Sequence, residues 1–177
     1  MKYAKIVFWV LVLSGLVQAV YPLEVYIKPG AGIYNDSVGL NGGVGFRGRL
    51  KNILRIENPR FFSGVSYGIS YAGMENITFL NHFFTVDFGY DFILPVLDNR
   101  ISIAPVIGIG GVYGSILSES GTVSEEFGFA LIPSAEAKFA LTDSLNLGIN
   151  AGYPLAFIYE GMIRYVELGV FFSYSFK

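Results

Sequence analysis

The sequence predicts an all-β fold, namely a closed, antiparallel, eight-stranded transmembrane barrel with an up-and-down meander. After residue 19, apolar residues alternate with small or polar ones and no helical period appears. Hydrophobic residues make up 53% of the 177 residues and charged residues 15%, whereas a soluble domain carries about 25% charge. No internal run of about 18 apolar residues marks a membrane helix. Any surface that faces lipid must therefore be assembled from strands.

The first nineteen residues differ from the rest and predict a secretory signal peptide. Lys2 and Lys5 precede the apolar run "IVFWVLVLSGL", and Val17 and Ala19 occupy the −3 and −1 positions of a cleavage site. An uncleaved anchor is the alternative, but the apolar run is short for a membrane span. We expect residues 1–19 to be removed and residues 20–177 to form the barrel. The absence of cysteine excludes disulfides, thiolate metal sites and a lipoprotein anchor.

Eight alternating segments of the chain are expected to be strands. They cover residues 21–33, 38–50, 61–72, 80–92, 100–113, 126–140, 144–153 and 164–177. The pieces between them are rich in Gly, Asn, Asp, Ser and Pro, which favour turns. Pro105 and Pro133 fall inside two of these segments, and each lacks the N–H that a strand donates to its neighbour. We expect bulges or local breaks at both prolines.

The composition of the two strand faces predicts which of them is turned outward. In the last segment, every second residue from Val166 to Phe176 is apolar, while the residues between are mostly small or charged. A soluble lipocalin-like barrel hides its apolar face and shows a charged face to water. A membrane barrel does the reverse, and small residues suit its narrow interior. Because the non-apolar face is rich in Gly, Ser, Asn and Ala, the sequence favours the membrane barrel.

Charged side chains on the non-apolar face are expected to form an ion-pair network that plugs the lumen, because buried charges are tolerated only when paired. The expected register places Glu24 near Arg47 and Arg49, and Asp91 near Arg100. A gated polar pathway is the functional alternative. The predicted network consists of Glu24, Lys28, Arg47, Arg49, Asp87, Asp91, Arg100, Glu136 and Lys138.

This pattern resembles the small eight-stranded bacterial outer-membrane barrels of the OmpX and OmpA-barrel type, over the whole mature chain. The ending "FFSYSF" is similar to the aromatic signal by which such proteins reach the barrel-assembly machinery. The resemblance implies that Phe172, Tyr174 and Phe176 act as this signal, although Lys177 follows them. It also implies a porin-like protein of the Gram-negative cell envelope, located in the outer membrane. The implied partners are membrane lipid and lipopolysaccharide, and the implied state is a monomer.

The same resemblance places both termini in the periplasm. The expected outer loops centre on 34–37, 73–79, 114–125 and 154–163, and the periplasmic turns on 51–60, 93–99 and 141–143. The outer loops are acidic, and a solvated rim is the simplest interpretation. A rim that recruits divalent cations or a basic partner is the alternative. The acidic residues are Asp36, Glu75, Glu119, Glu125, Glu126 and Glu160.

Catalytic and cofactor motifs are weak. The stretch "GVGFRG" (Gly43–Gly48) fits G-x-G-x-x-G, but it continues a strand and no helix follows. His82, the only histidine, is expected near the outer end of a strand on the lipid-facing side. Family members that resemble the lipid A deacylase use His, Ser and Glu on that wall, but here Phe84 stands two residues after His82. We expect no enzyme activity, cofactor, metal or nucleic acid.

These observations predict an integral outer-membrane protein with a plugged polar lumen and a structural, surface-contact or adhesion-like role. A narrow channel or carrier for a small or hydrophobic solute is one alternative. A soluble lipocalin-like binding protein is another.

Overall fold

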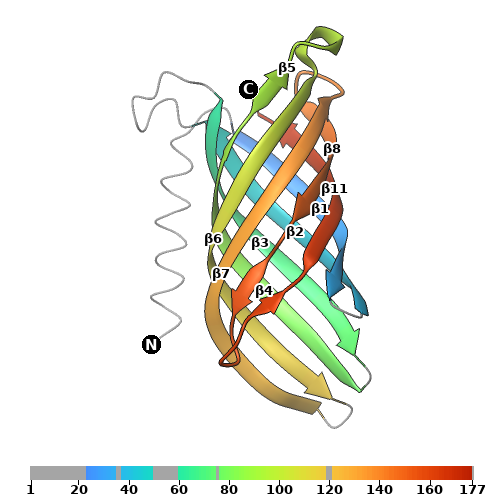
Figure 1. Ribbon diagram of the computed structural model, residues 1–177. Helices are drawn as coiled ribbons and strands as arrows, with labels where there is room; N and C mark the ends of the chain where they lie inside the picture. The colour runs from blue at the N-terminus through green and yellow to red at the C-terminus, as the bar shows by residue number, and fades with distance from the viewer. Residues whose placement is uncertain (1–22, 35–36, 50–59, 75, 119–120, 177) are drawn as a thin grey trace.

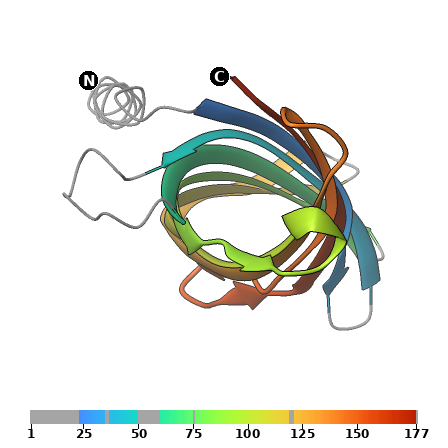
Figure 2. The ribbon, with the colours of Figure 1, turned by 90° about the horizontal axis from the view of Figure 1, so that it is seen from above.

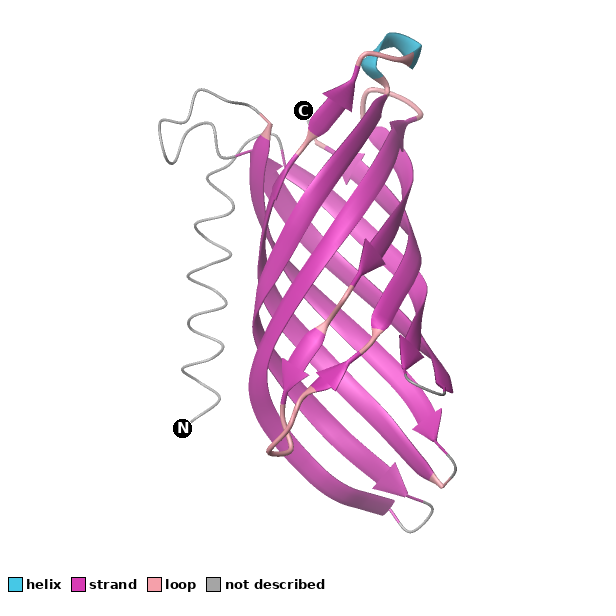
Figure 3. Cartoon of the chain, viewed as in Figure 1, coloured by secondary structure: helices cyan, strands magenta, loops and turns pink. Residues whose placement is uncertain are grey.

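The computed structural model describes residues 23–34, 37–49, 60–74, 76–118 and 121–176, which form one antiparallel sheet with short connections (Figures 1 and 3). The expected signal peptide and much of the turn at 51–60 lie outside these residues. No helix in the described ranges is long and apolar enough to cross a membrane. The eight long strands are β1 (Leu23–Tyr34), β2 (Ser37–Arg49), β3 (Phe61–Met74), β4 (Ile77–Tyr90), β6 (Ile101–Ser118), β7 (Gly121–Ala140), β8 (Leu145–Gly152) and β11 (Val166–Ser175).

Short elements extend some of these strands. β5 (Phe92–Leu94) follows β4, β9 (Leu155–Phe157) follows β8, and β10 (Ile163–Arg164) precedes β11. A short 3-10 turn, η2 (Leu97–Asn99), connects β5 to β6. We call the end of the barrel that carries η2 and the start of β1 the terminal end, and the opposite end the hairpin end (Figure 1).

Pairing of β1 with both β2 and β11 closes the sheet into a ring. Val25 is opposite Phe46 on one side and Tyr174 on the other, and Ile33 is opposite Val38 and Val166. The view along the barrel shows the strands arranged in this ring (Figure 2). Closure leaves no open edge along these strands, as a bilayer requires. The predicted closed, eight-stranded meander is confirmed.

The two faces of the wall are arranged as in a membrane barrel. Phe88, Leu168 and Phe172 are 45%, 50% and 42% exposed on the outside, whereas Asp87 and Glu136 are 7% and 1% exposed inside. Many other large apolar side chains are exposed around the wall. A soluble lipocalin-like carrier would have the opposite arrangement, so that alternative does not fit the structure.

The two prolines do not interrupt their own strands. β6 and β7 stay in register through Pro105 and Pro133, and the one register shift between them falls at Ile116 and Leu117. The breaks occur in the neighbouring strands instead. Pro105 faces the gap between β4 and β5, and Pro133 faces the gap between β8 and β9. Each missing N–H therefore points to a place where the partner strand is already interrupted.

All four expected outer loops are strands over part of their length. At 73–79, β3 continues to Met74 and β4 begins at Ile77. β6 runs to Ser118 and β7 begins at Gly121, so most of the expected loop 114–125 is a hairpin. The expected loop 154–163 contains β9 and β10, and β9 pairs with β7 at Phe129–Leu131. The pairing of β9 with β7 is explained by burial, because Ala156 and Ile158 belong to the apolar cluster inside the barrel.

Candidate functional site

A charged cluster crosses the lumen in the half nearer the terminal end, with Arg47 of β2 at its centre. The Arg47 Nε and Nη2 atoms donate to the two carboxylate oxygens of Glu24 at 2.7 and 2.9 Å. Its Nη1 atom donates to Glu136 of β7 at 2.6 Å. Arg47 is 3% exposed, so its charge is compensated by the buried Glu136 and the partly buried Glu24 rather than by bulk water.

Further ion pairs extend the cluster along the lumen. Lys28 Nζ lies 2.6 Å from the second oxygen of Glu136. On the side of the terminal end, Asp91 pairs with Arg49 at 2.5 Å and with Lys138 at 2.6 Å. Both Glu136 and Asp91 thus contact two cations each. Cross-lumen pairs of this kind connect strands that are not neighbours in the sheet.

Aromatic rings pack around the Arg47 guanidinium. Its central carbon lies 5.0 Å from the ring centre of Tyr26 and 4.9 Å from those of Phe62 and Phe171. Lys138 Nζ lies 5.3 Å from the Phe62 ring centre. Cations over aromatic faces gain further stabilisation when water is excluded. Strand alternation places Tyr26 and Phe171 on the non-apolar face, whereas the packing of these rings around Arg47 was not predicted.

Within the described ranges, two members of the predicted network, Asp87 and Arg100, form no ion pair of the charged cluster. Asp87 has no ion pair among the described residues and instead accepts hydrogen bonds from the Tyr26 hydroxyl at 2.8 Å and the Thr85 hydroxyl at 2.7 Å. Arg100 is exposed beside η2. Asp91, its expected neighbour, pairs with Arg49 and Lys138 instead, because the turn after β5 carries Arg100 to the rim.

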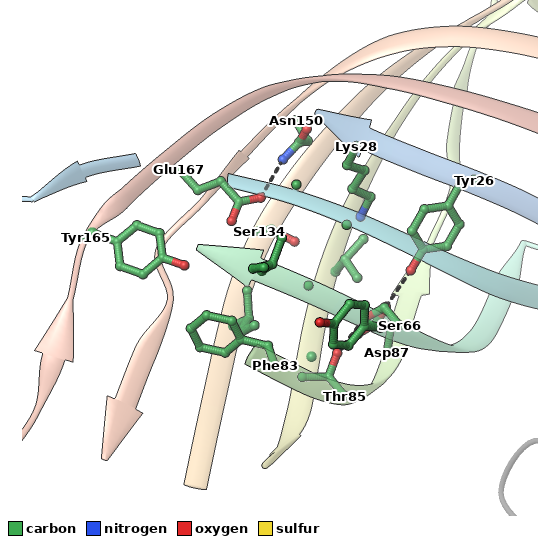
Figure 4. Close-up of a pocket in the computed structure, with 18 residues that line it drawn as sticks. Tyr26, Lys28, Ser66, Phe83, Thr85, Asp87, Ser134, Asn150, Tyr165 and Glu167 are labelled. Carbon is green, nitrogen blue, oxygen red and sulfur yellow. Dashed lines mark hydrogen bonds between the residues drawn. The ribbon is translucent and has the colours of Figure 1, made fainter. Parts of the chain in front are cut away.

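A small cavity of about 70 Å³, lined by both polar and apolar side chains, lies beyond the charged cluster. Figure 4 shows Lys28, Asp87 and Glu167 around it, with Asn150 donating to Glu167. The Asn150–Glu167 distance is 3.0 Å. Glu167 was not among the predicted network residues, although it has the inward parity of its strand.

An apolar cluster lies inside the barrel nearer the hairpin end. The rings of Tyr34 and Tyr165 stack with centres 4.3 Å apart, and Phe83 packs beside Tyr165. The buried members are Tyr34, Ala72, Phe83, Val112, Ala130, Ala156, Ile158 and Tyr165. The cavity therefore lies between a charged layer and an apolar layer.

The terminal end opens into a polar vestibule of about 490 Å³. Arg49, Asp91 and Lys138 form part of its lining together with the exposed rim residues Asp98 and Arg100. The backbone at Leu97, Asp98 and Asn99 has positive φ values of 48°, 56° and 62°. This vestibule ends at the ion pairs of Asp91.

The predicted acidic rim is only partly covered by the described residues. Asp36, Glu75 and Glu119 lie outside them. Glu125 and Glu160 are exposed, whereas Glu126 accepts a hydrogen bond from the Tyr159 backbone N–H at 2.5 Å. In the described ranges, no group of three or more His, Asp or Glu side chains is placed to hold a metal ion.

The residues of the predicted assembly signal lie on the outer wall. Phe172, Tyr174 and Phe176 all point outward and are exposed. Tyr174 and Phe176 stack edge to face with ring centres 5.0 Å apart. Lys177, which follows them, lies outside the described residues.

His82 also lies on the outer wall. In the described part of the chain, its hydrogen-bond partner is the Tyr67 hydroxyl, 2.6 Å from Nδ1. Phe84, two residues on, is exposed on the same face. The pair joins two aromatic rings and does not form a Ser–His–acid arrangement.

Comparison with known proteins supports the fold. No family model and no curated protein sequence matches the chain. Among solved structures, neisserial surface protein A is 12% identical with a TM-score of 0.64, over 87% of this chain and 96% of its own. The chain has the fold of the small outer-membrane β-barrels. The attachment invasion locus protein Ail of Yersinia pestis is 13% identical with a TM-score of 0.53, over 88% of this chain and 97% of its own.

The same barrel fold occurs in an enzyme. The outer-membrane enzyme PagL is 15% identical with a TM-score of 0.54, over 84% of this chain and 98% of its own. The neighbours are outer-membrane proteins, and the exposed apolar wall of this outer-membrane-type barrel agrees with the predicted location.

Proposed function

We propose that this protein is an integral outer-membrane barrel with a closed lumen and a structural or surface-contact role. The observation that carries the proposal is the contact of Arg47 with Glu24 and Glu136, because it places a buried charged layer across the lumen. The terminal end then faces the periplasm and the hairpin end faces outward. The barrel acts as a monomer surrounded by membrane lipid and lipopolysaccharide.

The packing between the two ends supports a closed lumen. An ion would have to pass the Asp91 and Arg47 clusters and then the apolar layer of Tyr34, Phe83 and Tyr165. Separating a buried ion pair leaves uncompensated charge, which is costly. An apolar layer also excludes hydrated ions. The alternative, a narrow channel or carrier, is favoured by the polar vestibule at the terminal end, and it requires both layers to open.

The long hairpin of β6 and β7 supports a role in surface contact. These are the longest strands, with 18 and 20 residues, and Figure 1 shows their hairpin extending past that of β1 and β2. Val123 and Glu125 are exposed near its tip. A rigid paired hairpin presents such side chains at a lower entropic cost than a flexible loop. We further propose that the acidic rim is solvated.

The proposal includes the absence of enzyme activity. It is supported by the environment of His82, whose Nδ1 atom binds the Tyr67 hydroxyl. An activated serine needs a base within hydrogen-bond reach. Lipid A from cells expressing wild-type protein or His82→Ala should have the same acylation pattern by mass spectrometry. A pattern that depends on His82 would overturn this part of the proposal.

Conductance in planar lipid bilayers tests the closed lumen. Purified wild-type protein should produce no steady open channel. Arg47→Ala combined with Tyr165→Ala should permit brief conducting events, because the double change removes the centre of the charged layer and one ring of the apolar layer. Arg47→Ala alone leaves the apolar layer in place and should conduct less than the double variant. Ile149→Ala is the matched control, since Ile149 is 65% exposed on the outer wall, and it should behave like the wild type. Large, steady conductance by the wild type would contradict the proposal.

A further inference from the structure

A polar pair interrupts the apolar outer wall. Tyr67 of β3 and His82 of β4 both point outward, and the Tyr67 hydroxyl lies 2.6 Å from His82 Nδ1. His82 is opposite Ile69 on one side and Tyr113 on the other. Its ring centre lies 6.0 Å from that of Tyr67 and 6.2 Å from that of Tyr113. Polar atoms on a lipid-facing wall are costly unless a polar group meets them.

An apolar groove of about 520 Å³ begins directly beside this pair. Tyr67 lines the groove, and Phe84, two residues from His82, lies 5.0 Å from the Tyr67 ring centre. Much of the remaining lining consists of exposed apolar side chains from neighbouring strands, including Val44, Phe46, Ile109 and Phe127. The groove and the polar pair form one continuous surface, which we call the Tyr67–His82 groove.

A glycine helps to keep the groove open. Gly111 has the outward parity of β6, between the exposed Ile109 and the partly exposed Tyr113. A Cβ at this position would lie 2.7 Å from the Phe127 ring. A larger residue would displace this ring or fill the space. The hollow therefore depends on the lack of a side chain at an otherwise bulky wall position.

The Tyr67–His82 groove combines an apolar depression with a hydrogen-bonding end. When the Tyr67 hydroxyl donates to Nδ1, the neutral His82 ring carries its proton on Nε2, which is then the donor for a ligand. A phosphate oxygen accepts such a bond strongly because it is charged. An acyl chain matches the apolar part. A phosphorylated lipid carries both groups in one molecule.

We propose that the Tyr67–His82 groove holds one phosphorylated lipid of the surrounding bilayer, with an acyl chain in the groove and the phosphate at His82. A bilayer lipid is the occupant because the groove is continuous with the apolar wall that this fold turns toward lipid. The polar pair distinguishes this position from the neighbouring wall positions of Ile69, Phe84 and Ile109, which are apolar. The lipid would be held more tightly here than elsewhere on the barrel.

Native mass spectrometry of the full-length mature protein in detergent tests the proposal. The probes are phosphatidylglycerol and a diacylglycerol with the same chains, which lacks the phosphate. Wild-type protein should retain one phosphatidylglycerol and bind it about tenfold more tightly than diacylglycerol, as expected for a charge-assisted hydrogen bond. His82→Phe should abolish this preference while still binding the chains. Gly111→Leu should weaken both lipids.

Ile149→Leu on the distant β8 wall is the control and should bind both lipids like the wild type. A change in electrophoretic mobility on boiling confirms that each variant is folded. Equal affinity of the wild type for the two lipids, or an unchanged preference in His82→Phe, would overturn the proposal. A dimer that forms only when the groove is intact would also overturn it, since a second copy would then be the occupant. Lipid binding at this outer surface leaves the conductance test of the lumen independent.

Discussion

Arg47 on β2 and Glu136 on β7 meet across the lumen, with Nη1 and the carboxylate oxygen 2.6 Å apart, although 89 residues separate them in the chain. Neither strand is the sheet neighbour of the other. The contact therefore ties opposite walls of the barrel together. The contribution of this contact to the stability of the barrel and its effect on conductance through the lumen can be tested separately.

Removing one partner of this contact should destabilise the barrel strongly. Arg47→Met removes the cation that Glu24 contacts and leaves Glu136 with Lys28 alone. Loss of one partner from a buried ion pair costs about 3–5 kcal/mol. Urea unfolding of protein inserted into liposomes measures this loss. Combining Arg47→Met with Glu136→Gln should cost less than the sum of the single changes, because the two residues belong to one network. Strict additivity would show that the contact is energetically unimportant.

A charge introduced on the outer wall should cost more folding free energy in the apolar band than near the tip of a hairpin. Phe88→Arg places a cation in the exposed apolar band and should cost about 2–4 kcal/mol of folding free energy if Phe88 lies near mid-membrane. Val123→Arg, near the tip of the β6–β7 hairpin, should cost about 0–1 kcal/mol because its side chain can reach water. Urea unfolding of each variant inserted into liposomes measures the two losses of folding free energy. Equal small costs would mean that Phe88 does not lie in the apolar centre of the bilayer.

Two strand glycines should differ sharply when replaced by alanine. A Cβ at Gly110 would lie 1.9 Å from the Phe84 carbonyl oxygen on the neighbouring strand, whereas one at Gly73 meets nothing within 4 Å. Gly110→Ala should therefore cost about 1–3 kcal/mol through overpacking. Gly73→Ala should be neutral or slightly stabilising. Chemical denaturation measures the free energy of unfolding of both variants. Similar losses in the two variants would contradict the close approach of β4 and β6.

The last strand should matter for assembly more than for stability. Phe176→Ala should lower the amount of folded barrel in the membrane, if the final aromatic residues are read by the assembly machinery. Phe92→Ala is a matched control, because Phe92 is also an exposed aromatic residue near the terminal end. Mobility shifts on boiling measure the folded fraction in cells. An equal loss in both variants would argue against a specific signal.

The alternation of apolar and small residues was sufficient to predict which side chains point outward from the barrel wall. Strand parity depends only on the period of two, so the outward positions of Phe88, Leu168 and Phe172 follow directly from the pattern. The ends of the strands were less predictable. The turn residues in "YPLAFIYEG" suggested a loop, but burial of Ala156 and Ile158 inside the barrel favours the short β9–β10 hairpin.

The ion pairs could be predicted as a set but only partly as pairs. Glu24 and Arg47 are direct cross-strand neighbours, so hairpin register predicts their contact. Asp91 pairs with Arg49 and Lys138 instead of Arg100, since strand tilt and long side chains determine contacts across the lumen. The alternation places Tyr26 and Phe171 on the non-apolar faces of their strands, with Glu24 and Glu167, and the structure agrees. Their packing with Phe62 around the Arg47 guanidinium was not predicted, because a period of two gives the face of a side chain but not its contact across the lumen.

The most direct test of the inside-out arrangement uses single cysteines in β4, because the chain has no cysteine of its own. Spin labels at positions 84 to 88 can be compared for collision with oxygen, which concentrates in lipid, and with a polar nickel reagent. The structure predicts high oxygen access at Phe84, Val86 and Phe88 and low access at Thr85 and Asp87. The reverse alternation, or equal access at all five positions, would contradict a barrel with apolar residues facing lipid and charged residues inside.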